Sequence, residues 1–288
     1  MRLTARLRRR TWLKAAPVIY GVRRFGAMSR TDTERTDSLS DSKQYQSIQR
    51  YVRVGGALYL YIIFAGIFAE VFVRSQLVVS GDTSATAANI LASEFLFRAG
   101  LSAELLMLIC DVSLALIFFL VLRPVSFLLA LFAASLRLVM VAVSSANLLN
   151  HMDALLWLNG TSGLEVLGSN EVQALAYHSL RSHAFGYHLA LVFFGFYCVT
   201  LGALIVRSEV LPKLLGYLLI MAGVCYLTNS FGSILAVEAI SKVGPAILLP
   251  ALVAELSLAL WMLIKGINIE KWRMLQRAMP GGLDEARA

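Results

Sequence analysis

The sequence predicts an all-α fold, a polytopic helical membrane bundle of about six transmembrane helices. Of its 288 residues, 58% are hydrophobic and only 15% are charged, with a mean hydropathy of +0.70. Soluble domains average about 45–50% apolar and about 25% charged residues. Six segments also have the roughly 20 apolar residues that a helix needs to cross a bilayer. These observations exclude a soluble globular enzyme.

The six expected spans are bounded by basic residues or by proline. Outside them, a short helix is expected at Ser84–Phe97 and another from Asn170, both within longer connections. A turn is expected at Asn159–Gly163. The spans are expected at Val54–Val73, Leu101–Leu122, Val125–Leu149, Ala184–Val206, Leu214–Val237 and Val243–Ile264.

The distribution of lysine and arginine predicts that both termini lie in the cytoplasm. With six spans, 21 of the 26 basic residues fall on the side that carries the two termini, and four fall on the other. Only Arg137 lies in mid-span. Cytoplasmic segments carry the excess of positive charge, so the orientation is predicted to be N-in and C-in.

The net charge of +8 belongs entirely to one N-terminal arm, residues 1–27, which holds eight basic residues and no acid. The charge therefore does not predict a nucleic-acid partner. The arm resembles a transit peptide, could bind anionic lipid, or lies upstream of a true start at Met28. The domains expected are a tail at 1–49, the membrane domain at 50–268 and a tail at 269–288.

A buried ion pair is predicted between the second and third spans. Asp111 lies about 12 residues before the Arg123-Pro124 turn and Arg137 about 13 after it, so both lie near the same depth in a helical hairpin. The pair has a structural interpretation, fixing helix register, and a functional one, because ionisable residues in a bilayer often mark a functional site.

Further polar residues follow at intervals of seven. Glu104 precedes Asp111 by seven residues, and Ser144 and His151 follow Arg137 in the same way, so Glu104 is expected to face Ser144. Glu255 is expected near mid-depth, protonated or sharing Arg137. An outer polar layer is expected to comprise Glu70, Glu104, Asn147, His151, His188 and Asn229.

No metal site and no cofactor are predicted. His178, His183 and His188 are five residues apart, whereas ligands on one helix face need a spacing of three or four. Only a break in the helix at Ser182–Gly186 could bring these three histidines together. The three cysteines lie in apolar runs and suggest neither a disulfide nor a metal site.

Glycines at a spacing of seven predict close helix packing. Gly195 and Gly202 fall in the fourth span, and Gly216 and Gly223 in the fifth. Small residues allow transmembrane helices to approach closely. These faces could pack inside the bundle, so the oligomeric state is left open.

Dispersed but collinear stretches over about residues 50–268 resemble the bacterial integral-membrane family of the domain of unknown function 4386. The resemblance implies a helical protein of the bacterial cytoplasmic membrane and implies no activity. The stretches that carry it are 55–59, 67–70, 87–91, 105–124, 132–150, 183–195, 211–219 and 248–261.

Three functional hypotheses follow, and whether the protein is an enzyme is left open. The first is binding or transport of a small substrate or protons by Asp111, Arg137 and Glu255 in the lipid bilayer. The second is an accessory membrane subunit in which the buried charges only fix packing. The third is a lipid-directed intramembrane enzyme whose site comprises Glu104, Ser144, His151, His183 and His188.

Overall fold

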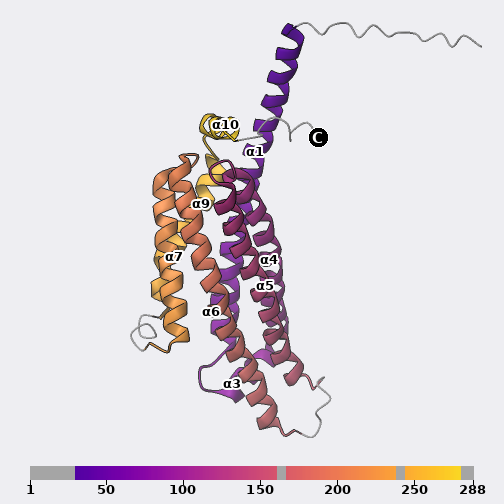
Figure 1. The fold of residues 1–288 in the computed structure, drawn as a ribbon. Coiled ribbons are helices and arrows are strands. Elements are labelled where there is room, and N and C mark those ends of the chain that lie inside the picture. The colour runs from indigo at the N-terminus through magenta and orange to yellow at the C-terminus, as the bar shows by residue number, and fades with distance from the viewer. Residues whose placement is uncertain (1–29, 161–166, 238–243, 280–288) are drawn as a thin grey trace, which may run out of the picture. The chain divides into compact units, whose positions relative to one another are not determined.

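A computed structural model describes residues 30–160, 167–237 and 244–279 (Figure 1). In these ranges every regular element is helical and none is a strand. The chain divides into two units, Met1–Lys43 and Gln44–Ala288. The basic arm, Met28, most of the Asn159–Gly163 turn and the start of the sixth span fall outside the described residues.

Six helices are long and apolar enough to cross a membrane, as the sequence predicts. Shorter elements connect them or follow the last one. Four of these spans are the helices α4 (Glu94–Leu122), α5 (Phe127–Leu158), α6 (Ser169–Ser208) and α7 (Lys213–Ile234). The first span, Gln46–Leu77, runs from within α1 (Arg30–Ile67) through the two short elements that follow it, and the last, Ala246–Ile264, joins the end of a short helix to α9 (Leu249–Ile264). The shorter elements are the π-helix η1 (Phe68–Arg74), α2 (Ser75–Leu77), α3 (Thr83–Ala92), the 3₁₀ helix η2 (Gly244–Leu248) and α10 (Ile269–Arg277).

Several helices differ from their predicted extents. The helix expected from Asn170 and the fourth span form one continuous 40-residue helix, α6, without a break at Ser182–Gly186. Gly186 sits in the helix interior, where glycine is tolerated at a modest energetic cost. The expected helix Ser84–Phe97 is instead divided at Ser93, whose φ of −129° is not helical.

Within the unit Gln44–Ala288, α6 packs between α5 and α7, while α4 lies against α5 and α9 against α7 (Figure 1). The predicted glycine packing is confirmed between α6 and α7. A Cβ built on Gly202 would lie 2.5 Å from the carbonyl oxygen of Gly216, and one on Gly223 would lie 2.6 Å from that of Gly195. The two backbones therefore touch directly.

The end of the bundle with the α4–α5 and α6–α7 turns is closed by α10. The indole N–H of Trp272 donates to the carbonyl of Val121 at 3.0 Å. In the α6–α7 turn, Glu209 forms ion pairs with Lys213 and Lys271. These two hydrogen-bonded lysines lower the pKa of Glu209 to about 2, and its carboxylate links α10 to the turn.

We expect Gly202→Ala to destabilise the protein and Gly66→Ala to leave it unchanged or slightly more stable. The methyl group at position 202 would meet a backbone carbonyl, and such overpacking typically costs about 1–3 kcal/mol. At position 66 the nearest atom is the Met107 sulfur at 3.9 Å, an ordinary contact. The free energy of unfolding in mixed micelles measures both, and equal effects of the two substitutions would contradict the close α6–α7 packing.

Candidate functional site

The predicted ion pair between Asp111 and Arg137 is present at the centre of the bundle. The Arg137 Nε–H donates to Asp111 Oδ1 at 2.9 Å, and Nη2 bonds the same oxygen. Arg137 also donates from Nη1 to the hydroxyl of Tyr197, at 2.6 Å. Arg137 is 0% exposed and Asp111 is 3% exposed, so the two charges are buried and neutralise each other.

Aromatic rings complete the surroundings of Arg137. Its guanidinium carbon lies 5.4, 5.5 and 4.7 Å from the ring centroids of Tyr59, Phe194 and Tyr197, within the range of cation–π attraction. The small void beside Tyr197 between α4, α5 and α6 has no room for a water molecule. The midplane charges thus sit in a packed core.

Glu255 has a different partner from the one the sequence suggests. The Tyr226 hydroxyl on α7 donates to Glu255 Oε1 at 2.6 Å, and Glu255 is 6% exposed. The described hydrogen bonds and ion pairs do not join this carboxyl to Arg137. Glu255 therefore links α9 to α7.

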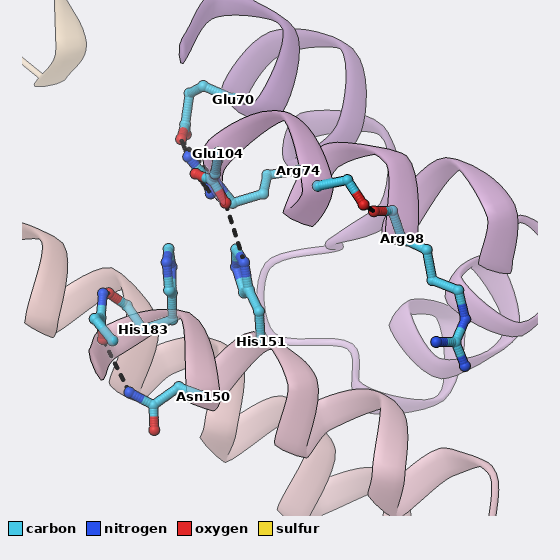
Figure 2. Close-up of polar contacts among 9 residues, drawn as sticks. Glu70, Arg74, Arg98, Glu104, Asn150, His151 and His183 are labelled. Atoms are coloured by element: carbon cyan, nitrogen blue, oxygen red, sulfur yellow. Dashed lines mark hydrogen bonds and ion pairs between the residues drawn. The ribbon is translucent and has the colours of Figure 1, made fainter. Parts of the chain in front are cut away.

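A second buried cluster lies toward the opposite end of the bundle and starts with Arg74 (Figure 2). Arg74 ends the π-helix η1, a rare helical form that often occurs at functional sites. Its Nη1 donates to Glu104 Oε1 on α4 at 2.7 Å, and its Nε donates to Glu70 Oε2, also at 2.7 Å. The Glu104 side chain is only 7% exposed, whereas that of Glu70 is 64% exposed.

Two histidines extend this cluster. Nδ1 of His151 on α5 lies 3.4 Å from Glu104 Oε2, and the ring of His183 on α6 is stacked on it, with centroids 3.5 Å apart and planes at 20°. Figure 2 shows the two rings side by side below Glu104. Glu104, His151 and His183 can bring one ligand atom each within 4.8 Å of the others.

The expected contact between Glu104 and Ser144 is wrong, because the Ser144 hydroxyl donates to the sulfur of Met140. Glu104 is bound instead by Arg74 and lies beside His151, two turns beyond Ser144 on α5. The predicted polar contacts between α4 and α5 are therefore present, with Glu104 beside His151 instead of Ser144.

A cavity of about 540 Å³ opens beside the second cluster. This volume is within the typical range of small-molecule sites, about 300–1,000 Å³. Its polar wall includes His188, whose Nδ1 lies 3.5 Å from the Asn229 amide nitrogen. The residues that line it are Glu70, Arg74, Ser75, Val78, His151, Tyr177, Leu180, Arg181, His183, Ala184, Tyr187, His188, Asn229, Ser233 and Leu248.

The remaining residue of the expected outer layer, Asn147, holds the backbone next to the cavity. Its amide nitrogen donates to the carbonyl oxygen of His183 at 2.9 Å and its amide oxygen accepts from Asn150 at 2.9 Å. A Cβ at Gly186 would lie 2.1 Å from the Asn147 oxygen. Glycine at this position therefore lets α5 and α6 approach closely enough to stack His151 on His183.

Sequence reasoning did not identify Arg74, Tyr197 or Tyr226 as partners of the buried charges. The hydrophobic pattern marks Arg74 as the polar boundary of the first span. It does not indicate that the helix becomes a π-helix over Phe68–Arg74. The two tyrosines occur in apolar segments. A search for hydroxyl-bearing residues at the depth of Arg137 and Glu255 could have found them.

The fold and these clusters define a multi-pass helical membrane protein with paired charges in its interior. The chain belongs to the family described as domain of unknown function DUF4386, whose model matches residues 54–266, and this confirms the resemblance. No curated protein and no solved structure gives a significant match to the chain.

We expect Asp111→Asn and Arg137→Gln each to destabilise the protein by about 3–5 kcal/mol, since each leaves a buried charge without its partner. The double substitution should lower the free energy of unfolding by less than the sum of the two single effects. Reversible unfolding of the four proteins gives the coupling energy directly. Strict additivity would show that the two side chains do not stabilise each other.

Proposed function

We propose that the protein binds a small anionic amphiphile, a molecule with a carboxylate or phosphate group and a short apolar part, in the 540 Å³ cavity. The cavity, with buried polar groups at one wall, is the observation that carries this proposal. Neither Asp111 nor Arg137 lines it. Their packed surroundings support a structural role, so the binding hypothesis moves from the midplane to the cavity.

The lining favours an anion with an apolar part. Two arginines, Arg74 and Arg181, and one acid, Glu70, line the cavity. Arginine has five N–H donors, and the described bonds of Arg74 occupy three of its nitrogen atoms without using every N–H. Apolar side chains such as Leu180 and Leu248 complete the wall.

A homologous series of linear carboxylates, from acetate to decanoate, tests this function on the purified full chain. We expect the midpoint of thermal unfolding to rise with chain length until the cavity is filled. Binding to the native state alone stabilises by about 2.7 kcal/mol at a ligand concentration 100 times Kd. Ala184→Trp should abolish the rise, because the indole would occupy the cavity.

Val224→Trp is the matched control, since Val224 is 53% exposed on the outer apolar face of α7 and is not part of the cavity lining. It should retain the full response. A response that is the same in both variants would show that the carboxylates act through the micelle, and would reject the cavity as the binding site.

The charge distribution and the family resemblance support a bacterial cytoplasmic membrane location with both termini in the cytoplasm. The cavity then opens on the opposite side, where α3 and the C-terminal end of α5 lie (Figure 1). A reporter that is active only in the cytoplasm, fused at the C-terminus, should be active, and one fused between Val79 and Thr83 should be inactive. The reverse pattern would overturn this orientation.

A further inference from the structure

We infer that Glu104, His151 and His183 form a zinc site at the wall of the cavity. The three residues come from α4, α5 and α6, and all are buried, with exposures of 6%, 4% and 4%. One carboxylate and two imidazoles are the ligand set that catalytic zinc sites use when a fourth position stays open. This inference does not require that a small organic molecule binds in the cavity.

The distance between His151 and Glu104 is compatible with a shared ion as well as with a direct ion pair. At 3.4 Å, Nδ1 and Oε2 are farther apart than the usual 2.7–3.2 Å of an N–H···O bond. Two atoms bound to one zinc ion at about 2.0–2.1 Å and at the tetrahedral angle lie about 3.4 Å apart. The three ligand atoms lie within 4.8 Å of one another, so His183 would move toward the other two when the ion binds.

His183 supplies the third ligand from a side chain that otherwise lacks a polar partner. In the described part of the chain, its backbone carbonyl is hydrogen-bonded to Asn147, while its ring makes only the stacking contact with His151. The ring lines the cavity, and its nitrogens are not among the fully buried described atoms that lack a hydrogen bond, so an ion that enters the cavity can reach them. Metal binding would require the two ring planes to open beyond 20° so that both nitrogens point to the ion.

The residues behind the ligands hold them in place, as outer partners do in metal sites. Arg74 occupies Glu104 Oε1, which leaves Oε2 to face the histidines. The ring of Phe97 packs edge-on against His151 at 5.7 Å. Since His151 and His183 line the cavity but Glu104 does not, the open fourth position of the ion would face the cavity.

Zinc would also change the charge of this wall. Glu70, Arg74 and Glu104 together carry one net negative charge, which Arg181 on the cavity wall balances, and a divalent cation would make this wall positive. The open position would then take water or an anionic oxygen, such as a carboxylate or a phosphate, that enters through the cavity. The site would thus have the parts of a metal-assisted hydrolase acting on an amphiphile, which matches the enzyme hypothesis raised by the sequence.

Metal analysis of the full chain tests the inference. Protein purified in detergent, incubated with zinc sulfate and desalted, should retain about one zinc ion per chain, and a His151→Gln/His183→Gln variant should retain less than a tenth of that. His178→Gln is the matched control on α6, the helix that carries His183, because His178 does not line the cavity, and it should retain zinc fully. Size-exclusion profiles establish that each variant is folded.

Cobalt substitution adds a readout that a merely structural role of the histidines would not produce. Cobalt(II) bound to the wild-type protein should show the intense visible bands of a tetrahedral site, and Glu104→Gln should weaken or shift them. Absence of zinc from the wild-type protein, its preference for iron or manganese, or equal loss of zinc in the His178→Gln control would each overturn the zinc site.

Discussion

The burial of Arg137 against Asp111 sets the register of α4 and α5, and much of the interior depends on that register. An unpaired guanidinium in an apolar bundle is strongly unfavourable, so the two helices are constrained to the one vertical alignment that joins these side chains. With Asp111 and Arg137 aligned, Glu104 comes within reach of His151. The pair at the centre therefore positions the polar cluster near the end, although it does not touch it.

The two clusters differ in packing, and this difference separates their roles. Around Arg137, three aromatic rings and the Tyr197 hydroxyl fill the available space. Beside His151 and His183, a cavity lies between residues of η1, α6 and α7. Charge alone does not distinguish a structural pair from a functional one, whereas access to a cavity does. The end cluster combines buried charge with space for a ligand, and the central one does not.

The sequence predicted most of the fold, because an apolar span of about 20 residues is a local signal. It also predicted the Asp111–Arg137 pair, since the Arg123-Pro124 turn fixes the depth of residues on both sides. It did not predict the partners of Glu104, because residue counting gives the depth of a backbone position and not the reach of its side chain, and because Arg74 approaches from a third helix. Arg74 was inaccessible to this reasoning, since its position depends on a π-helix that leaves no mark in the hydrophobic pattern.

The helix α6 connects the two clusters and explains how they coexist. Its Tyr197 bonds Arg137 and its His183 stacks on His151. Fourteen residues separate the two, which is about 21 Å along a helix and nearly four whole turns, so both face α5. The glycines on the other side of α6 seat it against the α7 backbone. Because α6 is packed on both sides, it has little freedom to rotate. The length of helix between Tyr197 and His183 therefore sets the distance between the cluster at Arg137 and the cluster at the cavity.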